Sequence, residues 1–189
     1  MKTLVARLFL SAIALGTTVG IAQTHGQHGG SYADLMTRPV KALSETQIAD
    51  MRAGRGMGLA LPAELNGYPG PSHTLELADR LGLDDTQKAR LRDLFATMKK
   101  EAITVGEQVI ALETDLDRQF TAGTITLPSL ASATAAIGER QAALRAAHLK
   151  YHLLTKDLLN PEQIKRYSDL RGYAASAPHH GSQTAPAKP

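Results

Sequence analysis

Apolar side chains recur with helical spacing along two long stretches of this chain. In residues 84–121 the steps between them alternate between three and four, with one extra step of four near the end, and no proline interrupts the stretch. The apolar positions are Leu91, Leu94, Phe95, Met98, Ala102, Val105, Val109, Leu112, Leu116 and Phe120. This spacing is typical of a long helix that packs one face along a partner helix. Gly106 lies outside the apolar stripe, so we expect it to face away from the partner.

The second stretch, residues 128–158, has similar spacing but more polar members. They are Leu130, Ala133, Ile137, Gln141, Leu144, His148, Tyr151, Thr155 and Leu158. A turn at residues 121–126 separates the two stretches, and so short a turn forces the helices antiparallel. The sequence therefore predicts an all-α fold, a long antiparallel helical hairpin with short flanking helices. Since such a hairpin cannot bury both faces, we expect a homodimer.

One short motif opens the predicted helices at three places. The copies are Leu83-Asp84-Asp85-Thr86-Gln87, Leu159-Asn160-Pro161-Glu162-Gln163 and Leu43-Ser44-Glu45-Thr46-Gln47. In each copy the short polar side chain can accept from the free N–H groups of a helix start, and the glutamine can reach back to the cap. The motif therefore predicts helix starts at Asp84, Asn160 and Ser44.

The two ends of the chain differ in composition from its middle. Residues 1–22 resemble a cleavable signal peptide, because a basic start precedes an apolar stretch and a small–x–small site. We expect a flexible arm at 23–42, a short helix with a Gly/Pro-rich loop at 43–71, the hairpin domain at 72–173 and a disordered tail at 174–189. The sequence therefore predicts a secreted protein.

Composition removes several classes of function. The chain has no cysteine, which excludes disulfides and thiolate metal sites. Two basic residues belong to the expected signal peptide, so the remaining chain is close to neutral and we expect no nucleic-acid partner. The sequence has no nucleophile elbow and no His-Glu-x-x-His motif, so we expect no enzyme.

Residues 53–71 lack helical spacing and are punctuated by glycine and proline. One interpretation is an ordered loop that packs its Leu and Met side chains across the helices. The other is a binding loop, because loops often carry function. The Gly54-x-Gly56-x-Gly58 spacing is not followed by the Lys-Ser/Thr of a phosphate loop.

The repeated Leu–cap–x–x–Gln motif resembles that of the periplasmic LTxxQ-motif family, which includes the Spy and CpxP chaperone-like proteins and related heavy-metal resistance sensors. In that family Leu-Thr-x-x-Gln precedes the first long helix and again the last. Asp84 and Asn160 stand here in place of the threonine and cap equally well. The resemblance covers residues 71–173. It implies a cradle-shaped periplasmic homodimer that holds unfolded or envelope proteins and, as CpxP-like members do, dampens a membrane sensor protein.

Basic residues beside the apolar stripes are the candidates for peptide binding. They are Arg90, Lys99 and Arg145. Exposed apolar side chains beside arginine and lysine can attract many chains weakly. The alternative is that these residues form a solvated outer face, paired with nearby acidic residues.

A metal site is the alternative function. His148 and His152 are four residues apart and so share a helix face, and antiparallel packing would bring His73 and Glu76 to them. The chaperone interpretation requires no cofactor, whereas these ligands would suit Ni, Co, Zn or Cu in a sensor or resistance protein. The resemblance is incomplete, since Leu77 stands where the nickel–cobalt sensors have a second histidine. An accessory subunit of an envelope complex is the third alternative.

Overall fold

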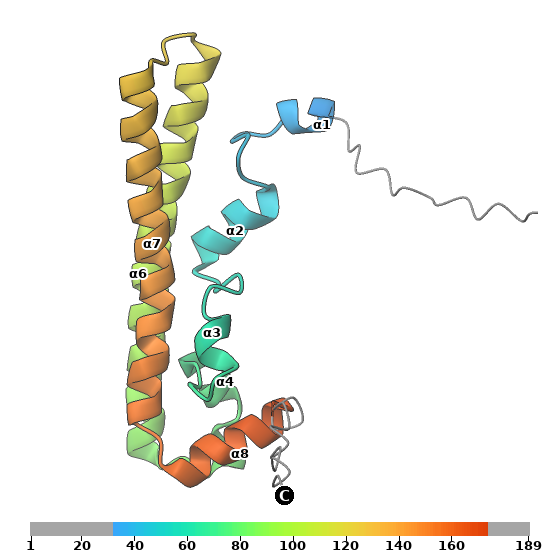
Figure 1. Ribbon diagram of the computed structural model, residues 1–189. Coiled ribbons are helices and arrows are strands. Elements are labelled where there is room, and N and C mark those ends of the chain that lie inside the picture. The colour runs from blue at the N-terminus through green and yellow to red at the C-terminus, as the bar shows by residue number, and fades with distance from the viewer. Residues whose placement is uncertain (1–31, 174–189) are drawn as a thin grey trace, which may run out of the picture.

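The computed structural model describes residues 32–173, which are all-helical and contain no strand (Figure 1). The helices are α1 (Tyr32–Met36), α2 (Glu45–Ala53), α3 (Leu61–Glu64), α4 (Pro71–Glu76), α5 (Ala78–Leu81), α6 (Asp85–Thr121), α7 (Leu127–Asp157) and α8 (Pro161–Arg171). The all-α prediction is confirmed for this part of the chain. The expected signal peptide at 1–22, the first part of the expected arm and the expected tail at 174–189 lie outside the described residues.

The two long helices, α6 and α7, lie side by side and run in opposite directions (Figure 1). A turn at residues 122–126 joins them, and Gly123 takes a positive φ of 64° there, which a glycine adopts without strain. We call this end of the pair the tip, and the opposite end, where α6 begins and α7 ends, the base. Asp84 caps α6, as its motif predicts, and Thr126 caps α7.

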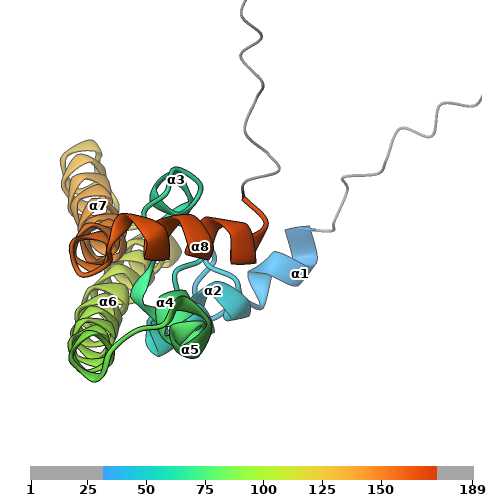
Figure 2. The ribbon, with the colours of Figure 1, turned by 90° about the horizontal axis from the view of Figure 1, so that it is seen from below.

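A segment from residue 40 to residue 77 runs along the helix pair, and we call it the strap. It contains α2, α3 and α4, which follow one another toward the base (Figure 1). The view from below in Figure 2 places them on one side of α6 and α7. α2 contacts α6, α3 contacts α7, and α4 contacts both long helices. The strap therefore adds a further layer to the pair.

The strap begins at residue 40, inside the segment 23–42 that the sequence predicts to be a flexible arm. The sequence predicts a flexible arm up to residue 42, but Val40 is only 4% exposed. It belongs to a core cluster with Leu43, Met51 and Val109. Helix α1 also lies within the expected arm. An isolated apolar residue in a polar stretch gives no periodic signal, so only the docking of α2 identifies Val40 as a core residue.

Gly106 lies at the contact between the strap and α6. The sequence predicts that it faces away from the apolar stripe. It is buried there because α2 packs against it, and a Cβ built on it would lie 3.0 Å from Met51 Cβ and 3.1 Å from the Met51 carbonyl oxygen. The absence of a side chain on α6 therefore lets α2 approach this closely.

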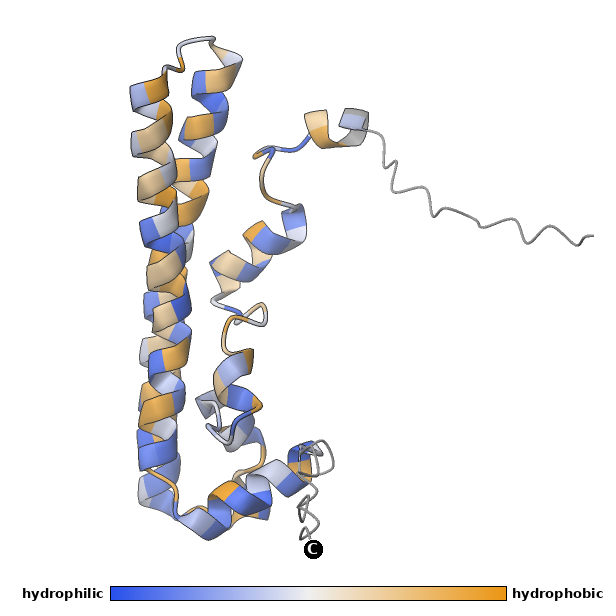
Figure 3. Ribbon diagram, in the orientation of Figure 1, coloured by the Kyte–Doolittle hydropathy of each residue, from blue (hydrophilic) through white to orange (hydrophobic). Residues whose placement is uncertain are grey.

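The base has its own core, and the tip has none. The base cluster consists of Leu81, Leu83, Leu91, Leu159 and Tyr167. At the tip Phe120 is 55% exposed and Leu127 is 83% exposed. Apolar and polar residues alternate along both long helices (Figure 3). None of the helices in residues 32–173 is long and apolar enough to cross a membrane.

Candidate functional site

The two copies of the motif at the base meet through their glutamines. Gln87 Nε2 donates to Gln163 Oε1 at 3.0 Å, and Gln163 Nε2 donates back to Gln87 Oε1 at 3.1 Å. Gln87 Nε2 also donates to the Leu158 carbonyl at 2.8 Å. The starts of α6 and α8 are therefore tied to each other and to the end of α7.

Each glutamine also completes its own capping box. The Gln87 and Gln163 backbone N–H groups donate to Asp84 Oδ1 at 2.7 Å and Asn160 Oδ1 at 2.8 Å. Each side-chain oxygen in turn accepts from the backbone N–H of its cap. The third copy, at Ser44, forms the same box, but its glutamine is exposed and reaches no other element. The motif residues at the base therefore cap α6 and α8 and hold these two helix starts together.

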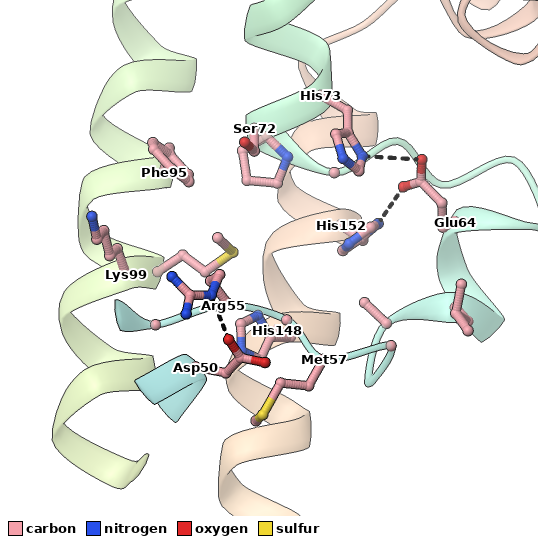
Figure 4. Close-up of a pocket in the computed structure, with 18 of the residues that line it drawn as sticks. Asp50, Arg55, Met57, Glu64, Ser72, His73, Phe95, Lys99, His148 and His152 are labelled. Carbon is pink, nitrogen blue, oxygen red and sulfur yellow. Dashed lines mark hydrogen bonds and ion pairs between the residues drawn. The ribbon is translucent and has the colours of Figure 1, made fainter. Parts of the chain in front are cut away.

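A cavity of about 610 Å³ lies between the strap and the long helices (Figure 4). Its wall combines the glycine-rich part of the strap with side chains of α6 and α7. Polar residues in the wall are Asp50, Arg55, Glu64, Ser72, His73, Lys99, His148 and His152. Apolar residues include Met57, Leu61, Pro71, Phe95 and Met98.

The Gly/Pro-rich segment supplies one wall of this cavity and also packs into the core. Met57 and Leu59 pack against the core cluster of α2 and α6, as the ordered-loop interpretation predicts. Leu61 and Leu65 do not, since they are 52% and 58% exposed. At Gly70 a Cβ would lie 2.7 Å from His152 Cε1, so only glycine permits this approach.

Glu64 is a buried carboxylate, only 6% exposed, in the wall of the cavity. Its Oε1 accepts hydrogen bonds from the Tyr167 hydroxyl and, at 3.0 Å, from the Tyr173 hydroxyl. The Arg171 guanidinium lies 3.7 Å from the same oxygen. Burial, followed by the hydrogen bond to Glu64, raises the pKa of the Tyr167 hydroxyl, so this group stays protonated and donates. Residues of α8 and its end thus hold the strap through Glu64.

Two histidines flank Glu64 on its cavity side (Figure 4). His73 Nδ1 lies 3.5 Å from Glu64 Oε1, and His152 Nδ1 lies 3.6 Å from Glu64 Oε2. His152 Nδ1 is also 2.6 Å from the Tyr68 carbonyl oxygen. Because a carbonyl oxygen only accepts, this nitrogen carries a hydrogen and donates it to Tyr68.

Two polar atoms of residues that line the cavity have no hydrogen-bond partner among residues 32–173. They are Glu64 Oε2 and His148 Nε2, and both residues are more than nine-tenths buried. Burial, reinforced by the nearby His152, lowers the pKa of the His148 imidazole and favours its neutral form. Both atoms are enclosed by protein, and a buried polar atom without a hydrogen bond costs free energy.

The predicted metal ligands are brought together only in part. His73, His148 and His152 all line the cavity, but Glu76 does not. Glu76 is exposed and accepts a hydrogen bond from Ser72 Oγ at 3.3 Å, because α4 turns that position outward. The carboxylate that lies beside the histidines is Glu64. Within residues 32–173 no group of three or more histidine and acidic residues has the arrangement of a metal site.

Sequence reasoning missed Glu64 because residues 53–71 have no periodicity that assigns a buried face. One signal was available. Glu64 is a single acid among Leu61, Ala63 and Leu65, between two turn segments. An acid in such surroundings is either exposed or buried with partners. Only the approach of α8 decides between these two outcomes.

The predicted peptide-binding residues lie in three different places. Arg90 lines a depression of about 350 Å³ between α6 and the end of α7. Lys99 lines the cavity under the strap. Arg145 is exposed on α7 and lines neither of these two hollows.

Comparison with family models, with curated proteins and with solved structures gave no match for this chain. The resemblance to the LTxxQ-motif family therefore stays a prediction that rests on the motif residues.

Proposed function

We propose that this protein is a periplasmic, chaperone-like protein or envelope-stress adaptor that binds unfolded polypeptides. The proposal combines the expected signal peptide, the all-α fold and the paired motifs at Gln87 and Gln163. It assigns no nucleic-acid partner, no enzymatic activity and no required cofactor. A helical hairpin with apolar side chains exposed near its base suits clients without a defined shape.

The observation that carries this proposal is the depression near the base. Its wall consists of Arg90, Asp93, Leu94, Leu154, Asp157 and Leu158. Leu154 is 40% exposed and its neighbour Leu153 is 53% exposed. Apolar groups bordered by charges of both signs can bind apolar segments of many sequences, while the charges keep the protein soluble.

An aggregation assay with a chemically unfolded client tests this proposal. We expect the full chain to suppress light scattering and Leu154→Gln to lose most of this effect. Leu127→Gln is the matched control, because it removes an even more exposed leucine at the tip and should act like the unchanged protein. Equal loss in both variants, or no suppression by the unchanged protein, would contradict the proposed function.

A homodimer and a membrane sensor partner are part of the same proposal. A hairpin that cannot bury both of its faces favours pairing with a second copy. Sedimentation of the full chain at two salt concentrations measures the dimer. A monomer at every concentration would remove the dimer but leave client binding to be judged by the aggregation assay.

The second candidate function is a periplasmic metal sensor or resistance protein that binds Ni, Co, Zn or Cu. The observation that favours it is the position of His73 and His152 beside Glu64, which takes the place predicted for Glu76. Imidazole nitrogens and a carboxylate are ligands that such divalent ions take. Excess metal should then raise the melting temperature, and His73→Ala should remove that rise. An unchanged melting temperature with each of these metals would contradict the metal-binding function.

A further inference from the structure

The acids that line the cavity under the strap are already compensated, whereas one of its cations is not. Asp50 pairs with Arg55, whose Nε lies 2.6 Å from Asp50 Oδ1. Glu64 is enclosed, and its Oε1 accepts from two tyrosine hydroxyls and faces the Arg171 guanidinium at 3.7 Å, so it repels an anion in the cavity only weakly. The ammonium group of Lys99 forms no ion pair with any residue between 32 and 173. The uncompensated charge of the wall is therefore positive.

Lys99 stands at an edge of the cavity that is open to solvent. The residue is exposed although it lines the cavity, and its stem packs on the strap, where a Cβ at Gly54 would lie 3.1 Å from Lys99 Cγ. Phe95 precedes Lys99 by four residues and so shares its helix face. Figure 4 shows the two side chains one above the other on α6. A cation and an aromatic ring thus lie next to each other at the open edge.

Behind this edge the wall suits a hydrocarbon chain. Phe95 and Met98 line the cavity from α6, and Met57 and Pro71 line it from the strap. Methionine side chains are flexible and adapt to apolar ligands of different shape. A volume of about 610 Å³ lies in the range of pockets that hold small organic molecules, and it is far larger than a single ion needs.

We propose that the cavity between the strap and α6/α7 binds an aliphatic carboxylate of medium chain length. The carboxylate contacts the Lys99 ammonium at the open edge, and the hydrocarbon chain lies against Phe95, Met98 and Met57. The site is separate from the depression near the base. It does not depend on the proposed binding of unfolded polypeptides.

Titration calorimetry with three ligands of one size tests the chemistry of the site. Octanoate, octanol and octylamine carry an anion, a neutral hydroxyl and a cation on the same hydrocarbon chain, and each is used below the concentration at which it self-associates. We expect octanoate to bind the full chain about threefold to tenfold more tightly than octanol, because Lys99 is exposed and solvent weakens its charge. Octylamine should bind most weakly.

A pair of lysine variants tests the contact with the carboxylate. Lys99→Gln should weaken octanoate binding about threefold to tenfold, to the level of octanol, and should leave octanol binding unchanged. Lys100→Gln is the matched control, because it removes the same charge from the next position, which is exposed and lines no part of the cavity.

A pair of leucine variants places the hydrocarbon chain in the cavity. Leu61 lines the cavity and is 52% exposed, so the fold tolerates Leu61→Gln, which should weaken both octanoate and octanol about threefold or more. Leu65→Gln is the matched control, because Leu65 is 58% exposed and does not line the cavity. Circular dichroism confirms that both variants keep their helices.

The outcomes separate this proposal from its competitors. Equal binding of octanoate and octanol, or unchanged octanoate binding in Lys99→Gln, would show a purely apolar pocket and overturn the carboxylate assignment. Equal losses in Leu61→Gln and Leu65→Gln would place the binding outside the cavity and overturn the site. No binding of any of the three ligands would overturn the whole proposal. The aggregation assay with Leu154→Gln measures a different surface, so the two proposals fail independently.

Discussion

The base and the tip of the α6/α7 pair have the same helical spacing of apolar residues but very different burial. At the base Leu91 is 0% exposed and Tyr167 is 1% exposed. At the tip Phe120 belongs to the same apolar stripe as Leu91 and is 55% exposed. The difference comes from what covers the pair, because α5, α8 and the strap surround the base and leave the tip uncovered.

This comparison shows that two helices alone do not bury a large apolar residue. Two helices in contact cover only one strip of each other, and a side chain needs neighbours on several sides before it leaves water. The base gains these neighbours through the paired glutamines, which fix α8 against the start of α6. The four predictions that follow compare covered and uncovered positions.

Leu91→Ala should have the largest effect on stability. Leu91 is fully buried in the base cluster, so the lost contacts and the remaining void should lower the free energy of unfolding by about 2–5 kcal/mol. Leu127→Ala at the tip is the control and should change it by about 0.5 kcal/mol or less. Urea denaturation measures both, and similar losses would show that the tip is also covered in solution.

Gln87→Ala and Gln163→Ala test the link between the two motifs. Each should lower the free energy of unfolding by about 1–3 kcal/mol, because each leaves the other part-buried amide without its partner. The double variant should lose less than the sum of the two single variants. Gln47→Ala removes the same capping contact without a second motif and should cost about 1 kcal/mol or less. Additive losses would contradict direct pairing.

Gly106→Ala and Gly138→Ala should have opposite signs. At Gly106 the new methyl group would meet Met51 at 3.0 Å, so the strap must shift, and the variant should lose about 1–3 kcal/mol. Nothing lies within 4 Å of a Cβ at Gly138, and alanine should stabilise α7 there by about 0.5–1 kcal/mol. Thermal unfolding followed by circular dichroism measures both. Stabilisation in both variants would mean that α2 does not pack on α6.

Two carboxylates of α6 should give the smallest effects, with opposite dependence on pH. The hydrogen bond from Lys150, at 2.8 Å, holds the pKa of Glu101 below its usual value, so its contribution is present at neutral pH and is lost on acidification. Burial raises the pKa of Glu113, so the folded state binds its proton more readily and gains stability as the pH falls.

Between about pH 5 and pH 3, Glu101→Gln should therefore lose less stability than the unchanged protein. Glu113→Gln should lose more over that range, and at neutral pH it should be more stable by less than about 1 kcal/mol. Urea denaturation at several pH values measures both variants. Parallel pH profiles for all three proteins would contradict the assigned environments of the two groups.

Local chemistry explains why much of the fold was predictable. The long helices follow from apolar spacing, and their starts follow from Asp84 and Asn160, because a cap is decided by residues within one turn. The same reasoning could place His148 and His152 on one helix face. It could not choose between Glu76 and Glu64, because that choice depends on how short elements without periodicity pack on α7 and α8.

The sequence by itself determined the helical class, the turn at Gly123 and the three capping boxes, since each depends on interactions between residues close in the chain. The tertiary structure alone decided that Gln87 meets Gln163, that Gly106 admits α2, and that Glu64 lies buried beside two histidines. These contacts join residues far apart in sequence, and each exists only because a third element reaches the helix pair. The spacing of residues along the sequence does not show where a third element packs on the helix pair.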